Sequence, residues 1–425
     1  MRLRSLVSAV LAFLVVFVVG GNLYLRVQVK KTFDQQLSQW QERVNKGLPP
    51  GREVKVEVKG VSSSFTPMPF LYPSNPFEVV GLRVLSAKGE VTLKRLAGTA
   101  ETSLGRVKGI RVTALEGLEG RYGEGVLTMG VKRVLFNPPL DVGRFFGWVK
   151  APIREAGGRM EGLTLSFINR KGGELEISVK EATFKQNVNL GMRGEAPPAQ
   201  PFKAQTTLKG TTVSFRELGD EKGVGEAFLD RVDLGYGLSR GKKETTYTFR
   251  EEMKAELSRL RLVLPPKDRN GNVTPEKLLP LKGGFKLELA NLSEDLVASA
   301  LELLETMQTQ SLPQDQRISL VIQFLQRGLP SLMAALVQGE ARLNFPQGSS
   351  FSARFRAGVM QLLTLKRGGN PMWVLLKVKN RDGLLALLSQ SGIRDEKIRG
   401  FLAGLECRGD VCEKRVAIGG GGQRF

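Results

Sequence analysis

The two cysteines of the chain, Cys407 and Cys412, are its most specific candidates for side-chain chemistry. If Gly409 and Asp410 form the two-residue turn of a hairpin, the cysteines face each other at the second residue pair from the turn, close enough for a disulfide. A disulfide is typical of an oxidising compartment such as a periplasm. A metal site would need more ligands, and the two-residue spacing of a redox pair is absent. We therefore expect a structural disulfide.

The rest of the sequence offers no catalytic pattern. The chain has no histidine, so the commonest general base and the commonest metal ligand are missing. The serine-hydrolase, phosphate-loop and dinucleotide-binding patterns are absent too. Two pairs of adjacent acids, Glu251–Glu252 and Glu294–Asp295, are interpreted as solvated helix ends, because adjacent residues on a helix do not converge. We expect no enzyme activity, no catalytic residue, no cofactor and no metal.

The longest apolar run lies near the N-terminus, from Leu6 to Val19, behind Arg2 and Arg4. Extended to Leu25, it is long enough to cross a bilayer as one helix, which takes roughly 20 apolar residues. A cleaved signal peptide is the alternative to an uncleaved anchor. We favour the anchor because the run is long, no Ala-x-Ala cleavage site is present and an aromatic residue lies where an interfacial one belongs. The proposed anchor residues are Leu6, Val10, Phe13, Phe17 and Tyr24.

Either interpretation places residues 27–425 outside the cytosol. The chain is strongly basic, with 63 Lys and Arg against 42 Asp and Glu and a net charge of +21. Such a charge is typical of proteins that bind nucleic acid or an anionic membrane surface. Export argues against nucleic acid, and the charges are dispersed, with no concentrated patch. We expect a solvated basic surface that is attracted to anionic phospholipid, and no nucleic-acid partner.

The sequence divides into four regions. Residues 1–26 form the transmembrane signal anchor, and residues 27–48 a juxtamembrane helix in which Phe33, Leu37, Trp40 and Val44 recur at helical spacing. Residues 49–281 form a β-rich periplasmic region, and residues 282–425 an α+β region with a terminal hairpin. Within the β-rich region, residues 141–156 could form a short helix that carries Phe145, Phe146 and Trp148.

Strict alternation marks the β-rich region as strands with one buried face. In Glu53–Lys59 the valines occupy one side and the charges the other. A weak repeat, apolar-x-Gly-apolar-x-apolar, recurs around Gly81, Gly109 and Gly162. Such a repeat is typical of an antiparallel meander, although chance produces short patterns of this kind in any β protein.

The C-terminal third follows a recognisable order of elements. The strand Gly284–Ser293 leads into two amphipathic helices, and Leu329–Phe345 has a Leu-Pro step before a strand. A helix near Asp382, a second helix and a closing hairpin follow. In this order, and in its N-terminal anchor, the chain resembles the YdgA-like family of bacterial envelope proteins, which is grouped with the AsmA-like superfamily.

The resemblance implies a single-pass inner-membrane anchor, a periplasmic β-rich body of grooved or taco-like form, and a role in envelope homeostasis or lipid handling. It implies no catalytic residues. We therefore expect an α+β, β-rich chain, with an N-terminal transmembrane helix, an elongated antiparallel sheet and amphipathic helices in the C-terminal third.

Two functions fit this pattern. In the first, an apolar groove binds or transfers lipid next to the phospholipid of the inner membrane. In the second, the protein is a scaffold that binds an envelope protein partner and has no ligand. A lipid-filled groove and a packed core give the same strand pattern, so both hypotheses stay open. A hydrolase with convergent carboxylates is the least favoured alternative.

Overall fold

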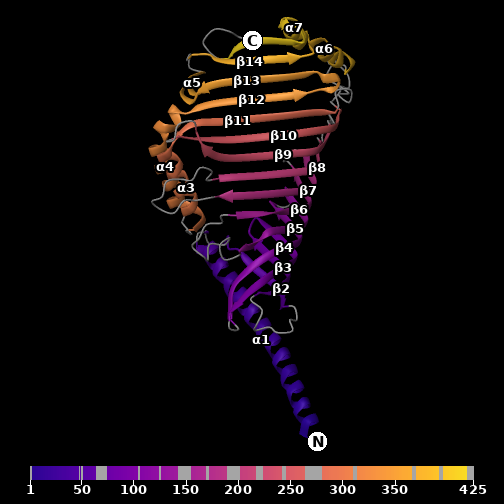
Figure 1. Cartoon of the computed structure of the whole chain (residues 1–425), viewed down its shortest axis with the longest axis vertical. Coiled ribbons are helices and arrows are strands. Elements are labelled where there is room, and N and C mark those ends of the chain that lie inside the picture. Colours follow the sequence, from indigo (N-terminus) through magenta and orange to yellow (C-terminus); the bar gives the residue numbers. More distant parts are fainter. Residues whose placement is uncertain are drawn as a thin grey trace. The chain divides into compact units, whose positions relative to one another are not determined.

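The computed structural model describes residues 2–46, 48, 51–63, 74–103, 106–123, 126–141, 155–168, 172–188, 202–216, 224–241, 246–263, 280–309, 314–365, 370–391 and 396–418. The described helices are α1 (Arg2–Lys46), α3 (Glu294–Thr309), α4 (Gln314–Ala334), α5 (Val359–Thr364), α6 (Arg381–Gln390) and α7 (Glu396–Ala403). The strands are β1 (Lys55–Ser63), β2 (Ser74–Ser86), β3 (Gly89–Ser103), β4 (Arg106–Tyr122), β5 (Leu127–Asp141), β6 (Glu155–Ile168), β7 (Glu174–Val188), β8 (Phe202–Arg216), β9 (Val224–Arg240), β10 (Thr246–Val263), β11 (Leu281–Ser293), β12 (Leu336–Asn344), β13 (Ser350–Gly358), β14 (Met372–Lys379), β15 (Glu406–Arg408) and β16 (Val411–Ile418) (Figure 1).

The chain divides into two compact units. Unit 1 comprises Met1–Leu163 and Glu305–Arg317, and unit 2 comprises Thr164–Leu304 and Ile318–Phe425. Strands that follow one another in the chain pair antiparallel in the sheet, except that β14 pairs with β16 and β15 lies at the edge. The predicted antiparallel, β-rich fold with helices in the C-terminal third is confirmed.

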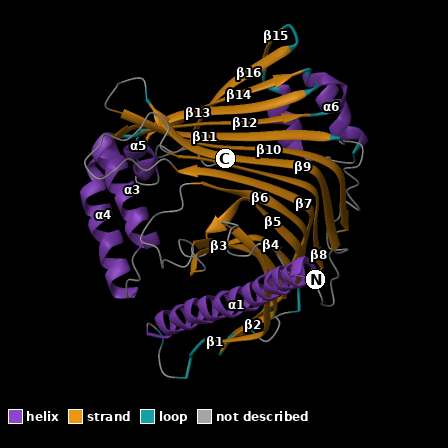
Figure 2. Cartoon of the chain, turned by 60° about the horizontal axis from the view of Figure 1, so that its bottom comes forward, coloured by secondary structure: helices purple, strands orange, loops and turns teal. Residues whose placement is uncertain are grey.

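Helix α1 covers part of the sheet of unit 1 with one apolar stripe. It is a single helix from Arg2 to Lys46, so the helix predicted over residues 27–48 is its C-terminal part. Val29 and Phe33 are buried four residues apart, and the ring of Phe33 lies 6.4 Å from that of Phe77 on β2. Leu37 packs against the same core cluster. The stripe holds α1 on the apolar face of strands β1–β4 (Figure 2).

Polar side chains of α1 also bind the backbone beside the free edge of β1. The Asn45 side chain accepts a hydrogen bond from the Val54 N–H at 2.8 Å and donates one to the Val54 carbonyl at 3.0 Å. Gln41 Oε1 accepts from the Val56 N–H at 3.3 Å. These amides take the place of a neighbouring strand at Val54 and Val56, where β1 begins.

Part of the predicted membrane anchor lies outside the described side chains. The backbone of α1 is helical from Arg2, but the side chains of Leu6, Val10, Phe13 and Phe17 lie outside the described residues. Tyr24 is described, and 45% of it is exposed. Among the described residues, no helix combines the length and the hydropathy that a membrane span requires.

The helix predicted over residues 141–156 falls mostly on residues that the structure does not describe. Phe145, Phe146 and Trp148 lie outside the described residues, and Asp141, the first residue of the predicted helix, is the last residue of β5.

The strands of unit 1 share a kink at which strict alternation breaks. In an alternating strand, residues three apart point to opposite faces. In strands β1–β4, however, two residues three apart pack into the same core cluster. The two consecutive residues between them therefore both point to the outer face. The extra outward residue bends the strand toward the core. The inward pairs in this cluster are Val58 and Val61, Val79 and Leu82, Leu93 and Leu96, and Leu115 and Leu118.

A glycine with positive φ and a lysine on the preceding strand meet at each kink. Gly117 has φ of 64°, and a Cβ there would lie 2.6 Å from Cδ of Lys94. A side chain would therefore face both left-handed backbone strain and a clash. The glycine–lysine pairs are Gly81–Lys59, Gly117–Lys94 and Gly162–Lys132 in unit 1, and Gly210–Lys180 in unit 2.

The predicted glycine repeat identifies only part of this series. Gly81 and Gly162 are kink glycines, whereas Gly109 is absent from the residues with positive φ. Gly117 and Gly210 escaped the pattern, because Gly120 and Thr211 stand where it requires apolar residues. Thr211 is nevertheless buried, so it occupies the inward position with a hydroxyl group.

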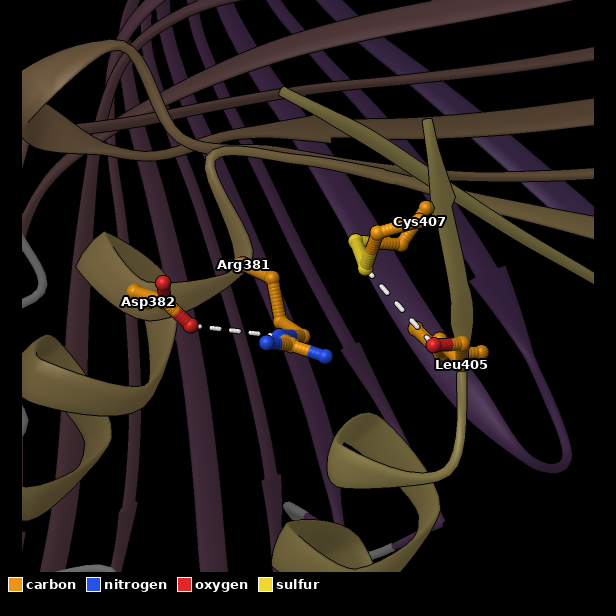
Figure 3. Close-up of a disulfide and its surroundings, with 5 residues drawn as sticks. Arg381, Asp382, Leu405 and Cys407 are labelled. Atoms are coloured by element: carbon orange, nitrogen blue, oxygen red, sulfur yellow. Dashed lines mark hydrogen bonds and ion pairs between the residues drawn. A yellow bond between two sulfur atoms is a disulfide. The ribbon is translucent and has the colours of Figure 1, made fainter. Parts of the chain in front are cut away.

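The C-terminal end of unit 2 has its own small core. Cys412 is buried with Val378, Leu384 of α6, Leu402 of α7 and Leu405. Cys407 and Cys412 are directly opposite each other in the β15–β16 hairpin, as the sequence predicted, and form a disulfide (Figure 3). The helix expected near Asp382 and the second helix expected after it are confirmed as α6 and α7.

We predict that Gly117→Ala destabilises the protein, whereas Gly60→Ala does not. Alanine at residue 117 must adopt positive φ against Lys94, which should cost about 1–3 kcal/mol of unfolding free energy. Gly60, in β1, has open space around its Cα and should change stability by less than about 0.5 kcal/mol. Urea unfolding of the full chain in detergent measures both. Equal stability of the two variants would contradict the role assigned to the kink.

Candidate functional site

The two faces of the sheet in unit 2 have opposite chemistry. Directly paired residues of an antiparallel sheet share a face, so the register defines rows that cross strands β7–β14 and β16. Row 1 consists of Phe184, Thr206, Leu234, Met253, Phe285, Ala341, Ala353, Leu376 and Lys414. Row 2, two residues further along each strand, consists of Gln186, Ala204, Tyr236, Glu251, Leu287, Gly339, Phe355, Val374 and Val416.

The row between them points to the other face and is rich in charge. It consists of Lys185, Gln205, Gly235, Glu252, Lys286, Glu340, Arg354, Leu375 and Arg415. We call the side of rows 1 and 2 the apolar face, and the opposite side the charged face. Successive residues of each strand belong to opposite faces. The sheet therefore has an apolar surface on one side and a surface solvated by water on the other.

Large side chains of the apolar face remain accessible in unit 2. Tyr236 and Met253 are each 41% exposed, although both lie inside strands that are paired on both sides. In unit 1, by contrast, Phe77 and Val79 are only 1% exposed in the core that includes Val29 and Phe33 of α1. Covering the remaining apolar area would contribute on the order of 1 kcal/mol for each large side chain. The apolar face of unit 2 is thus a surface on which an apolar ligand gains free energy.

Helices α3 and α4 close one end of this face. Tyr247, near the start of β10, is fully buried in a cluster that includes Leu296 of α3. Phe249 packs against the same cluster, together with Phe324 and Leu332 of α4. Two residues further, Glu251 is exposed. The covered part of β10 therefore ends between Phe249 and Glu251, and Figure 2 shows α3 and α4 at one end of the strands of unit 2.

Helix α4 carries a second exposed apolar surface. Ile318, Ile322, Leu325 and Leu329 recur at spacings of four, three and four, and each is about half exposed. Such a stripe follows one side of a helix. The contacts of α4 with Tyr247 and Leu292 thus cover only part of the apolar side of the helix.

The acid pair Glu251–Glu252 was assigned wrongly from the sequence. Both residues lie inside β10 and not at the end of a helix. Consecutive strand residues point to opposite faces, so Glu252 lies on the charged face, where Lys254 Nζ is 2.9 Å from its Oε1. Glu251 lies on the apolar face. The second predicted pair, Glu294–Asp295, does form the start of a helix, α3.

Carboxylates on the charged face are held by cations. Glu288 is the most buried example, with Arg250 Nε at 2.6 Å and Lys286 Nζ at 3.0 Å from its Oε1. Burial by itself would raise the pKa of Glu288. Hydrogen bonds from Lys286, Arg250 and Gln338, together with the charge of Arg250, outweigh it and lower the pKa below the ordinary value of 4.5.

A hollow of about 400 Å³ on the charged face lies over Gly235 and Gly237, between strands β8 and β10. Lys203, Arg250 and Glu252 line it, and Arg250 is already paired with Glu288. Among the described residues, no group of three or more acids or cysteines is placed to hold a metal ion.

The chain has no match among family models, curated proteins or solved structures.

We predict that Glu288→Gln changes how stability depends on pH. A carboxylate whose pKa is lowered by folding stabilises the protein above its unfolded pKa, and this contribution is lost as the pH falls through the folded pKa. The unfolding free energy of the wild type should therefore decrease as the pH falls below about 5, and that of Glu288→Gln should decrease less steeply. Urea unfolding at a series of pH values measures this.

Glu256→Gln is the matched control, because it removes an exposed pair with Lys282 on the same face. We expect it to follow the wild-type pH profile. If Glu288→Gln follows that profile as well, the network around Glu288 does not contribute to stability as stated.

Proposed function

We propose that the protein is a membrane-anchored envelope protein whose apolar face in unit 2 binds the hydrocarbon chains of phospholipid and passes them along the sheet. The observation that carries this proposal is the exposure of Tyr236 and Met253 in the middle of an apolar surface. Soluble proteins rarely leave large contiguous apolar surfaces without a function.

The chemistry of rows 1 and 2 favours hydrocarbon over a peptide as the occupant. Each central strand is paired on both sides, so its backbone has no free donors or acceptors for an added strand. The side chains offer few polar groups, and a peptide would lose its hydration without replacement, at a cost of about 1–3 kcal/mol for each unsatisfied group. An acyl chain has no such groups to satisfy.

The dimensions of the apolar face support passage as well as binding. Each row crosses nine strands, and strands lie about 4.8 Å apart, so a row extends for about 38 Å. This exceeds the roughly 30 Å hydrocarbon thickness of a whole bilayer. A lipid therefore has several positions along row 1, between which it can slide without crossing a charged side chain before Lys414, whereas row 2 contains Glu251.

The proposed location rests on the N-terminal sequence, the disulfide and the YdgA-like resemblance. The apolar run Leu6–Val19 would be a single-pass inner-membrane anchor, with the bulk of the chain in the periplasm. A Cys407–Cys412 disulfide fits that oxidising compartment. The net charge of +21 would attract the chain to anionic phospholipid at the membrane surface.

We predict that a phospholipid with a photoreactive acyl chain labels the apolar face when the full chain is reconstituted in proteoliposomes. Peptide mass spectrometry should locate adducts on β9, β10 and β11. Met253→Glu should reduce these adducts more than about ten-fold, because covering an unpaired carboxylate with hydrocarbon costs several kcal/mol. Gln205→Glu adds the same charge to the charged face and should leave the labelling unchanged.

Labelling confined to α1, with none on strands β9–β11, would contradict lipid binding. In that case an envelope protein partner that covers the apolar face becomes the working explanation, and chemical cross-linking in the membrane would identify it.

A further inference from the structure

Glu251 is the only acidic residue in rows 1 and 2. Its directly opposite neighbours on the apolar face are Tyr236 on β9 and Leu287 on β11. Along its own strand, Phe249 and Met253 flank it on the same side. A carboxylate therefore stands inside an otherwise apolar neighbourhood, directly beyond the part of β10 that the α3–α4 cluster covers.

The carboxylate of Glu251 has no ion pair or hydrogen bond with any part of the chain that the structure describes. The neighbouring acids on the charged face differ in this respect. Glu252 pairs with Lys254, and Glu256 pairs with Lys282 at 3.1 Å. Glu251 is exposed, so water solvates it as long as the apolar face is empty.

Lipid binding would remove that water. Acyl chains that cover Met253 and Leu287 would also cover the carboxylate beside them, and a buried charge without a partner is strongly unfavourable. The complex is stable only if the ligand itself brings a cation or a strong donor to Glu251. This requirement follows from the position of the residue, and it excludes ligands whose polar group is purely anionic.

The position of Glu251 also orients the ligand. The α3–α4 cluster covers Tyr247 and Phe249 on one side of it, while Met253 is open on the other. A head group at Glu251 would lie against the covered end, and its chains would run away from the helices over Met253 and the rest of row 1.

We propose that Glu251 binds the ammonium group of an aminophospholipid of the phosphatidylethanolamine type, and so selects amine-bearing lipids over purely anionic ones. This inference rests on the proposed function and deepens it. The selected group is a primary ammonium, which supplies both a positive charge and hydrogen-bond donors to the carboxylate.

The test is a competition in proteoliposomes that contain the full chain. Phosphatidylethanolamine and phosphatidylglycerol with the same photoreactive acyl chain are added in equal amounts, and their adducts on β9–β11 are counted. The wild type should favour the ethanolamine probe by about three- to five-fold, the range of a partly exposed ion pair. Glu251→Gln should bring the ratio to about one, and Glu251→Lys should reverse it. Glu252→Gln, on the opposite face, should keep the wild-type ratio.

The possible results separate the two proposals. Labelling of the apolar face by both probes in equal amounts, or a ratio that Glu251→Gln does not change, overturns the role of Glu251 and leaves lipid binding intact. Absence of labelling by either probe on these strands overturns the proposed function, and the inference with it.

Discussion

The register of the antiparallel sheet is the constraint on which the rest of the structure depends. A slip of one residue in any strand would move all its side chains to the other face. A kink with two consecutive outward residues likewise moves every later side chain of that strand to the other face. If only one strand had such a kink, its apolar side chains would point among the charges of its neighbours. The structure avoids this because the kinks occur at paired positions, where a glycine such as Gly117 lies opposite a lysine such as Lys94. The faces therefore stay matched on both sides of the bend.

The two units illustrate two ways to satisfy an apolar sheet face. In unit 1, α1 lies on the face, and its Phe33 packs against Phe77 with both residues almost fully buried. In unit 2, the α3–α4 pair covers Tyr247 but leaves Met253 accessible. Folding alone accounts for the covered part, since it buries apolar area within the chain. The open part, on the side of the sheet opposite the charged residues, gains free energy only when something apolar is placed on it.

The hairpin and several strands could be predicted from the sequence, because their signals lie in residues close together along the chain. The spacing of Cys407 and Cys412 around a Gly-Asp turn identified the hairpin, and alternation identified β1. The kinks were only partly predictable, because their signature needs a glycine and its partner on another strand; Gly210, followed by Thr211, does not fit an apolar pattern. Glu251 was missed because its significance depends on which face it occupies. An adjacent pair of acids looks the same in a helix end as in a strand, and only the pairing with Tyr236 and Leu287 places it.

The most direct test of a lipid-binding apolar face is native mass spectrometry of the full chain, expressed with lipid present and purified in a mild detergent. We expect a mass above that of the polypeptide by a whole number of phospholipids, and the same species after the detergent is exchanged. Met253→Glu, which places a charge on the face, should yield the mass of the polypeptide alone. A wild-type mass without bound lipid, unchanged after incubation with liposomes, would contradict the central claim.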